Sequence, residues 1–446
     1  MEGLKRLAGA LVLLLLGCRG PEDLADVPVP RATRGYVVIS IDTLRADHLG
    51  SYGYGKPTSP FLDSLAKRGT LFEEAYAQFP STLVSHMSML TGLHPREHGV
   101  FPPNAVLSPQ VELLPEVFQR HGFRTGGFTE GGFMSGRFGF RRGFDEFHAR
   151  DRNRNRPLEG TFRRGVQFLE GLKRDDRFLL FLHTYAVHTP YDAPDRYRKP
   201  FWPGPPPPEA IPATGPALTR QNALGEALPQ PAVDWLAALY DAGIRQTDEV
   251  IQRFFADLER LGLADDVTVI VTSDHGEEFQ DHGRFNHTQL YREVLRVPLL
   301  VIHPDKREAV RHAGVVQLVD LAPTLYELAR LKPKGKPTGT SLARLLGHPS
   351  PPRPGKAWAE NIGDERALYR GEREELESLL FFVSRAELYD VTEDPAQKRD
   401  LSGDRPRLRS LLKEMTAFKP QPVAPATAPP LDPELEKQLR ALGYLH

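Results

Sequence analysis

The stretch from Tyr36 to Ile41 is an apolar run rich in β-branched residues. Such a run predicts a strand that is buried on both faces, which is the usual environment of strands in parallel sheets. Asp42 follows it directly, and in open α/β sheets ligand sites gather at the carboxyl ends of the strands. Asp42 is therefore a candidate ligand, although a carboxylate in this position can also serve only to form a turn.

Strand-like and helix-like patterns alternate after this run. The predicted helices are 58–67, 113–119 and 161–172, and the predicted strands are 71–76, 124–128, 178–182 and 267–271. This alternation is typical of a doubly wound α/β fold, and 446 residues suffice for one large domain with a smaller appendage. Apolar residues at helical spacing from Leu236 to Leu258 predict a long amphipathic helix. The proline-rich stretch from Lys199 to Pro231 lacks apolar periodicity, so we expect a long surface loop there.

The segment from Phe79 to Gly92, FPSTLVSHMSMLTG, places a Pro-Ser-Thr turn directly before a short helical pattern. We expect Thr82 to be the N-cap of that helix. A hydroxyl there lies among free backbone N–H groups at the positive end of the helix dipole, where a bound anion or a developing alkoxide is stabilised. The simpler interpretation is that Thr82 or Ser81 only caps the helix.

Further strand ends carry an acid and several histidines. Asp274 and His275 follow the last predicted strand, with a glycine behind them to turn the chain, which is a strong pattern for metal ligands. His287 lies shortly beyond this pair. His183 and His188 follow the strand predicted at 178–182. All of these lie where the chain leaves a buried strand, as Asp42 does.

The first 18 residues are typical of a bacterial lipoprotein signal peptide. Lys5 and Arg6 precede the apolar run 7–16, which is too short to span a bilayer as a mature helix. A cleavage box, Leu15–Cys18, ends at the only cysteine of the chain, and lipid on Cys18 would tether the protein to a membrane. The alternatives are an uncleaved anchor and an ordinary secretory signal. In each case we expect an extracytoplasmic protein of the bacterial cell envelope.

Residues 19–34 contain Pro, Asp and Arg without apolar periodicity, and we interpret them as a tether between membrane and domain. The formal net charge of the whole chain is -1, from 57 basic and 58 acidic residues. This balance gives no reason to expect a nucleic-acid partner. We expect a small-molecule, lipid or glycan ester as the substrate.

Taken together, these motifs resemble the sulfatase branch of the alkaline phosphatase superfamily. The matching stretches are ISIDTLRADHLGSYGY, PSTLVSHMSMLTGLHPREHGV, the His-Thr-Pro-Tyr at His188, YDAGIRQTDEVI, VTSDHGEEF and LYREVLRVPLL, with ELYDVTEDPAQKRDL near the end. The resemblance runs from Tyr36 to about Leu401. It implies a catalytic α/β domain at 35–330, in which helices flank a central, mostly parallel sheet, and a small C-terminal subdomain with a tail at 331–446.

The nucleophile position departs from the sulfatase pattern. In the family it stands ten residues before the glycine of Leu-Thr-Gly, so that Thr82 occupies it here. Sulfatases have Cys or Ser there, converted to formylglycine within a Cys-x-Pro-Ser-Arg frame. Threonine cannot form this aldehyde, and His86 replaces the arginine. By resemblance, Thr82 is closer to the threonine nucleophile of phosphoethanolamine transferases and lipoteichoic acid synthases, which use one metal ion.

The resemblance assigns metal binding to Asp42, Thr82, Asp274 and His275. Sulfatases usually have more carboxylates among these ligands. Fewer carboxylates and an added imidazole favour Zn²⁺ or Mn²⁺, whereas Ca²⁺ would be expected in a true sulfatase. A second ion is not expected, because Thr184 stands where two-zinc phosphatases of the superfamily have an aspartate. The cofactor prediction is therefore one divalent metal ion.

The resemblance also implies a mechanism. Thr82 attacks phosphorus in a phosphate mono- or diester, while His188 and His287 stabilise charge and one of them protonates the leaving oxygen. His86, His98 and His183 are candidate substrate-binding residues. For His98 and His183 the alternative is a packed structural histidine.

Two other functions remain open at this stage. The first is that of a genuine sulfatase. The second is that of a non-catalytic binding lipoprotein with a sulfatase fold, which the lost arginine favours and which the intact Asp42, Thr82, Asp274 and His275 oppose.

Overall fold

A computed structural model describes residues 27–101, 105–149, 157–306, 308–349, 355–372, 374–423, 426–427 and 433–441. The strands are β1 Gly35–Ile41, β2 Thr70–Tyr76, β3 Ala105–Val106, β4 Arg124–Phe128, β5 Glu146–His148, β6 Phe178–Thr184, β7 Val267–Thr272, β8 Glu278–Phe279, β9 Phe285–Asn286, β10 Arg296–Ile302, β11 Val310–Gln317, β12 Gly355–Glu360, β13 Arg366–Glu372, β14 Glu375–Phe381, β15 Ala386–Asp390 and β16 Ala426–Thr427. The α-helices are α1 Pro60–Ala66, α2 Thr82–Thr91, α3 Pro95–His98, α4 Leu114–Arg120, α5 Pro157–Glu170, α6 Asp195–Arg198, α7 Gly215–Leu224, α8 Gln230–Arg260, α9 Arg292–Leu295, α10 Leu321–Ala329, α11 Arg405–Ala417 and α12 Pro433–Ala441.

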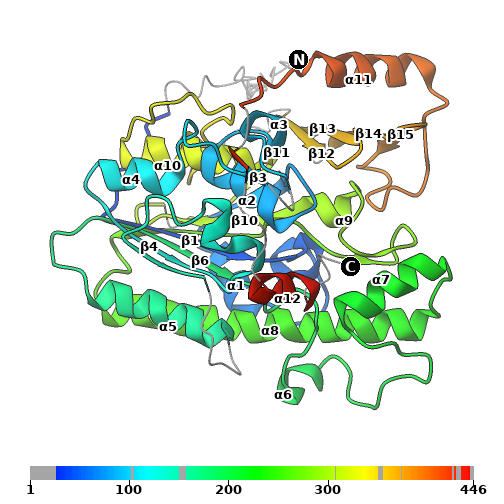
Figure 1. Ribbon diagram of the computed structural model, residues 1–446, viewed down its shortest axis with the longest axis horizontal. Helices are drawn as coiled ribbons and strands as arrows, with labels where there is room; N and C mark the ends of the chain where they lie inside the picture. The colour runs from blue at the N-terminus through cyan, green and yellow to red at the C-terminus, as the bar shows by residue number, and fades with distance from the viewer. Residues whose placement is uncertain are drawn as a thin grey trace, which may run out of the picture.

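One twelve-stranded sheet organises the described residues. Its strand order is β15-β14-β13-β11-β2-β10-β7-β1-β6-β4-β5, with β12 paired to β13 (Figure 1). β7, β1, β6, β4 and β5 are parallel neighbours, whereas β10 pairs antiparallel with both β7 and β2. Every residue of β1 is buried, because neighbouring strands flank it and helices cover both faces of the sheet. The predicted α/β fold with a central, mostly parallel sheet is confirmed.

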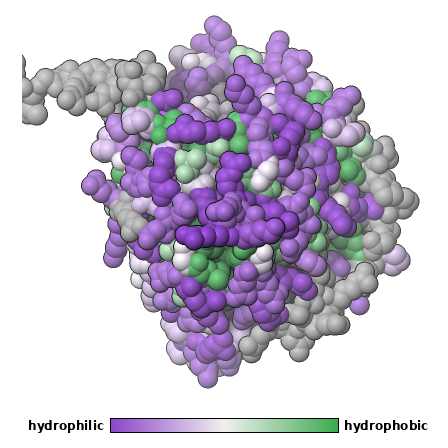
Figure 2. Space-filling model, turned by 90° about the vertical axis from the view of Figure 1, so that its left-hand side faces the viewer, coloured by the Kyte–Doolittle hydropathy of each residue, from purple (hydrophilic) through white to green (hydrophobic). Residues whose placement is uncertain are grey.

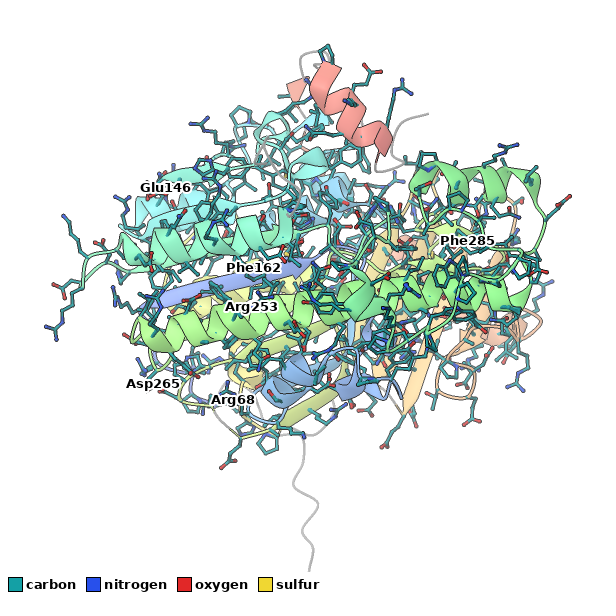
Figure 3. The ribbon with its side chains drawn as sticks, turned by 90° about the horizontal axis from the view of Figure 1, so that it is seen from below. Arg68, Glu146, Phe162, Arg253, Asp265 and Phe285 are labelled. Carbon is teal, nitrogen blue, oxygen red and sulfur yellow. The ribbon has the colours of Figure 1, made fainter. Side chains whose placement is uncertain are left out.

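Helices cover both faces of this sheet. On one face α5 and α8 lie side by side, and the rings of Phe162 and Phe254 join them at a centroid distance of 5.7 Å (Figure 3). On the other face α2, α4 and α10 share a core that includes Met87, Phe118 and Leu325 (Figure 1). The sheet is therefore the middle layer of three, and its carboxyl edge stays open for side chains that leave the strands.

The predicted helices and strands are all present, but the long loop predicted from Lys199 to Pro231 is wrong. Helix α7 lies inside this range, and α8 begins before its end. Both helices have a proline in the first turn, where the missing N–H removes no intrahelical hydrogen bond. Helix α7 is short and buries few residues, so its sequence lacks the apolar periodicity from which a helix is predicted.

The C-terminal part extends the same sheet. β12 to β15 join it through the pairing of β13 with β11, and α11 packs on β13 and β14 through Leu408, Leu411 and Met415. These elements lie together at one end of the molecule (Figure 1). The predicted boundary between residues 330 and 331 falls just after α10, and it stays a prediction.

The signal peptide and Cys18 lie outside the described residues, as does the first half of the tether predicted at 19–34. The remainder of that segment packs against the domain: Val27 and Thr33 are buried, and Arg31 forms ion pairs with Asp266 and Asp305. Residues 27–34 are therefore not a free tether, because these contacts hold them to the sheet domain.

Helices long and apolar enough to cross a membrane are not found among the described residues. The side of the molecule in Figure 2 is covered mainly by hydrophilic residues, with small hydrophobic areas between them. Most large apolar side chains instead lie in the cores on the two faces of the sheet.

Candidate functional site

Two neighbouring parallel strands bring the predicted metal ligands together. Asp42 follows β1, and Asp274 follows β7, whose register pairs Ser40 with Thr272. One ligand atom from each of Asp42, Asp274 and His275 lies within 4.8 Å of the others, and all three residues are fully buried. The predicted juxtaposition of these three side chains is therefore present.

The atoms of this group fit a cation. Asp42 Oδ1, Asp274 Oδ2 and His275 Nε2 are buried and have no hydrogen-bond partner among the described residues. His275 Nδ1 lies 3.0 Å from the Gly276 carbonyl, which can only accept, so the imidazole proton is on Nδ1 and a lone pair is on Nε2. That lone pair lies 3.3 Å from Asp274 Oδ2. Two acceptors facing each other in a dry site require a positive charge between them, as a divalent ion would supply.

The electrostatics of the two carboxylates point the same way. Burial, together with the nearby charge of Asp274, raises the pKa of Asp42 well above its usual range. Because like charges this close destabilise one another, a bound cation would favour ionisation of both.

Thr82 is the first residue of α2, and Ser81 is the N-cap, so the predicted N-cap position of Thr82 is wrong by one residue. The cause is the backbone: Ser81 has extended torsion angles and Thr82 already has a helical conformation. The Thr82 hydroxyl donates a hydrogen bond to Asp42 Oδ2 over 3.1 Å, and the side chain is fully buried. Thr82 thus still lies in the first turn of α2, directly beside the acidic pair.

His86 lies one turn further along α2, behind Thr82. Its Nδ1 donates to the Thr82 carbonyl at 2.8 Å, and its Nε2 accepts from the Ser40 hydroxyl at 2.9 Å. Burial lowers the pKa of this imidazole. Both nitrogens have protein partners, so His86 is positioned to support Thr82 and Ser40, and it does not face a substrate as predicted.

His183 lies at the end of β6 and contacts the other side of Asp42. Its Nε2 is 3.1 Å from Asp42 Oδ2, the oxygen that also accepts from Thr82. The Asp42 carboxylate is therefore divided: Oδ2 faces Thr82 and His183, while Oδ1 belongs to the cation group. This arrangement places His183 inside the site, as predicted.

His188 and His287 form the opposite wall. Their ring centroids are 5.3 Å apart, and His287 lies 4.3 Å from the ring of His275. His188 Nδ1 donates to the Thr189 carbonyl at 2.6 Å, and His287 Nδ1 lies 3.3 Å from a Glu277 carboxylate oxygen. Burial is the main cause that lowers the pKa of each to about 4. Both predicted catalytic histidines thus border the cation group in the neutral form.

His98 is not brought to this group. It is fully buried beyond the end of α2, its Nε2 lies 3.1 Å from the Ser88 hydroxyl, and its Nδ1 accepts from the Val100 N–H. Burial lowers its pKa to about 3. His98 lies away from the cation group, at the end of α3, where its contact with Ser88 joins α3 to α2. Its predicted substrate-binding role stays a prediction that this placement does not support.

Sequence reasoning missed Ser40 and Tyr185. Ser40 is a polar residue within an apolar strand, two positions before Asp42, and this interruption was a usable signal. Tyr185 stands two residues after His183, and its ring contacts those of His183 and His188 at 4.7 and 5.6 Å. Its buried hydroxyl lies beside Thr82, and burial raises its pKa well above the usual range.

Comparison with known protein families shows which family the chain belongs to. The sulfatase family model matches residues 34–331, well over half of the chain, and the model of the N-sulphoglucosamine sulphohydrolase C-terminal region matches residues 280–418. The chain belongs to the sulfatase family. It is an ester hydrolase of that superfamily, and divalent-metal use in the superfamily agrees with the Asp42, Asp274 and His275 group.

Curated relatives of this sulfatase-family chain are distant in sequence. An ulvan-active sulfatase of Formosa agariphila is 24% identical over 461 residues, covering 94% of this chain and 86% of that protein. Arylsulfatase K of Homo sapiens is 25% identical, and the match covers 64% of this chain and 61% of that protein.

Solved structures share the fold at still lower identity. A protein in complex with its substrate D-glucosamine-2-N,6-O-disulfate has a TM-score of 0.69 at 17% identity, covering 93% of this chain and 98% of the other. A phosphonate monoester hydrolase of Agrobacterium radiobacter has a TM-score of 0.67 at 18% identity, with coverages of 87% and 95%.

Proposed function

We propose that this protein is a metal-dependent hydrolase of phosphate mono- or diesters in which Thr82 is the nucleophile. The observation that carries the proposal is the Thr82 hydroxyl, which donates to Asp42 Oδ2 in the first turn of α2, beside the acceptor group of Asp42, Asp274 and His275. The residue at this position is threonine, which cannot yield the aldehyde that sulfatases use.

The first step uses contacts already present around Thr82. Thr82 Oγ attacks phosphorus, its proton moves to Asp42 Oδ2 at 3.1 Å, and the bond from phosphorus to the leaving oxygen breaks. His183 Nε2 supports the same carboxylate oxygen at 3.1 Å. The product is a phosphothreonine at residue 82. Free backbone N–H groups in the first turn of α2 favour the negative charge that develops there.

The second step releases the phosphoryl group to water. His188 and His287 each have Nδ1 directed at an oxygen acceptor, so Nε2 carries the lone pair in the neutral ring. One of these Nε2 atoms accepts a proton from the attacking water, the bond from phosphorus to Thr82 Oγ breaks, and Thr82 recovers its proton from Asp42. The imidazolium then gives its proton to the hydroxide ion that remains after the departing alcohol oxygen has taken a proton from water in the first step, which restores the resting state.

One divalent ion fits the residues of this site. Asp42, Asp274 and His275 would hold it, with Thr82 beside them, and the ion would lower the pKa of the Thr82 hydroxyl and neutralise charge on the transferred group. We propose zinc or manganese, because an imidazole and two carboxylates suit a borderline cation better than calcium.

A second candidate function is sulfate-ester hydrolysis. It is supported by the curated relatives, which are named as sulfatases, and by a fold neighbour solved with a sulfated sugar. Two phosphonate monoester hydrolases among the fold neighbours support phosphorus esters instead. The glycan-bound neighbours favour a sugar ester as the natural substrate over an aryl ester.

The test is an assay of aryl phosphate, aryl phosphodiester and aryl sulfate side by side, on protein depleted of metal and then reloaded. We expect turnover of at least one phosphorus ester to exceed that of the sulfate ester by more than tenfold. A preference for the sulfate ester would replace the proposal with the second candidate. No turnover of any ester in the reloaded protein would favour a binding lipoprotein.

We also propose that the protein acts outside the cytoplasm, tethered through lipid on Cys18, as the first 18 residues indicate. Mass spectrometry of protein from bacterial membranes should find a diacylated N-terminal cysteine at position 18. An unmodified chain that begins elsewhere would contradict this part of the proposal and leave the catalytic part intact.

A further inference from the structure

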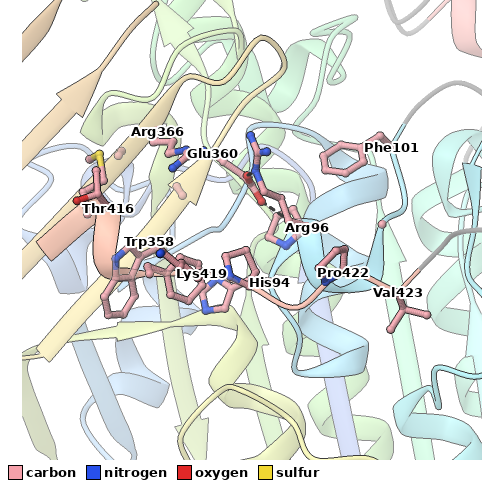
Figure 4. Close-up of a pocket in the computed structure, with 17 residues that line it drawn as sticks. His94, Arg96, Phe101, Trp358, Glu360, Arg366, Thr416, Lys419, Pro422 and Val423 are labelled. Carbon is pink, nitrogen blue, oxygen red and sulfur yellow. Dashed lines mark hydrogen bonds and ion pairs between the residues drawn. The ribbon is translucent and has the colours of Figure 1, made fainter. Parts of the chain in front are cut away.

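A cavity of about 710 Å³ is lined by His94, Trp358 and Lys419, among other residues (Figure 4). It lies beyond the C-terminal end of α2, the helix that begins at Thr82. Thr82 begins this ten-residue helix, and Gly92 ends it with a left-handed conformation. His94, which lines the cavity, follows two residues later. Ten residues of α-helix span about 15 Å, so the cavity is separate from the Thr82 site. Its volume lies in the range of small-molecule pockets.

One wall of this cavity is an aromatic platform. The rings of Trp358 and Phe418 stack with centroids 5.0 Å apart and planes 20° from parallel, and His94 meets Phe418 at 4.7 Å. Burial lowers the pKa of His94 to about 4, so this ring is uncharged at neutral pH. The buried Met415 also lines the cavity. The wall is flat and apolar, and it suits a ligand that has a flat apolar face.

The opposite rim carries charges that mostly cancel. Arg96 pairs with the buried Glu360 and, at 2.6 Å, with Asp364, and Arg366 lies 4.0 Å from Asp364. Two arginines thus face two carboxylates. Lys419 is exposed on the same cavity, and the described part of the chain contains no ion pair for it. Among the described residues, Lys419 is therefore a positive charge on this cavity that no carboxylate neutralises.

We propose that this cavity binds one sugar ring that carries a single negative charge. The apolar C–H face of the ring would pack on the outer face of the stacked pair of Trp358 and Phe418, and its anionic substituent would reach Lys419. The ion pair of Arg96 and Glu360 offers donors and acceptors to the ring hydroxyls. An acyl chain fits less well, because it would desolvate that ion pair without replacing its water contacts.

The experiment uses the Thr82→Ala variant, so that no turnover occurs, and the cavity variants below separate binding in this cavity from binding at the Thr82 site. Isothermal titration is carried out with glucose 6-sulfate, glucuronic acid, glucose and phenyl sulfate. We expect the two anionic sugars to bind at least tenfold more tightly than glucose. Phenyl sulfate should bind more weakly than both.

Two variants locate the binding. Lys419→Ala should reduce the affinity for the anionic sugars to that for glucose, whereas Lys413→Ala, an exposed lysine on α11, should change nothing. Trp358→Leu should abolish binding; a melting curve checks its fold. The chain has three tryptophans, and Trp202 and Trp235 pack on one another elsewhere, so a fluorescence change lost in Trp358→Phe reports this cavity.

Several results would overturn the proposal. Equal binding of glucose and the anionic sugars, or an unchanged affinity in Lys419→Ala, would remove the role of charge. Tighter binding of phenyl sulfate than of either sugar would make the occupant an aryl anion. No binding of any probe at millimolar concentration would show that the cavity holds no such ligand. None of these results bears on Thr82 as a nucleophile.

Discussion

Replacing the Thr82 hydroxyl tests the proposed chemistry most directly. Thr82→Ala removes the only described hydroxyl that donates to Asp42 Oδ2. Ser85 Oγ donates to the Asp274 carbonyl at 2.7 Å, and Ser40 Oγ bonds His86 Nε2. Burial raises the pKa of the neighbouring Tyr185 hydroxyl well above its usual range, so this hydroxyl stays protonated and is a poor nucleophile. Water would have to replace Thr82 as the attacking group. We expect kcat to fall by about 10⁴-fold, or roughly 5 kcal/mol in activation free energy.

Two matched variants separate chemistry from folding. Thr82→Ser keeps the hydroxyl and loses one methyl group, so activity should stay within about tenfold of wild type. Thr91→Ala lies in the last turn of the same helix, where the Thr91 hydroxyl bonds only the Met87 carbonyl and the backbone of Leu93. It should cost about 1 kcal/mol of stability and leave kcat unchanged.

The assay measures steady-state turnover of an aryl phosphodiester and an aryl phosphate, with an acid quench during turnover to trap the intermediate. Digestion and mass spectrometry should find phosphate on the peptide that contains Thr82. Retention of more than a tenth of the activity in Thr82→Ala would refute the reasoning, as would phosphate on any other residue.

Two more predictions concern the ion and the fold around it. Elemental analysis of the purified protein should find about one zinc or manganese per chain, because the described residues contain one such set of acceptor atoms. Asp274→Asn should lower this content, and stoichiometric calcium or two ions per chain would contradict the assignment. Burial raises the pKa of Glu130 from its ordinary 4.5 to about 7, so the folded state favours the neutral form of this side chain. The stabilisation that results is complete below pH 4.5 and is lost as the pH rises through 7. In Glu130→Gln, Oε1 can accept from the Tyr185 N–H, and Nε2 can donate to the Thr184 hydroxyl in place of the hydrogen bond that this hydroxyl donates in wild type. The unfolding free energy of this variant relative to wild type, from urea titrations, should rise between pH 4.5 and 8 by up to about 3 kcal/mol, and by less in so far as solvent reaches the residue. An unchanged difference across this range would show that Glu130 is not desolvated.

Sequence patterns predicted the sheet because buried parallel strands leave a strong signal. Every residue of β1 and β6 is buried, and such strands require apolar runs that a reader can find. The acid or histidine at the end of each run was equally visible. Helix α7 was missed because few of its residues are buried and it needs no apolar stripe.

The direction of individual side chains was less predictable. His86 and His98 both lie near α2, and sequence alone gave each a place in the pocket. The fold turns His86 toward Ser40 and the Thr82 carbonyl, and it turns His98 toward Ser88. The hydrogen-bond partners of these ring nitrogens lie on elements that are distant in the sequence. No local sequence pattern can therefore predict the direction in which each imidazole points.

The neutral charge of His86 influences which phosphorus ester the site binds better. Sulfatases of the resembling pattern have an arginine at this position, and arginine always carries charge. His86 donates from Nδ1 and accepts at Nε2, which only the neutral imidazole can do. The site therefore has one positive charge fewer beside Thr82 than that pattern provides. A phosphodiester has one negative charge and a phosphomonoester at neutral pH has close to two, so the loss of a cation weakens binding of the monoester more. The diester is for this reason the better candidate of the two phosphorus esters that we propose as substrates.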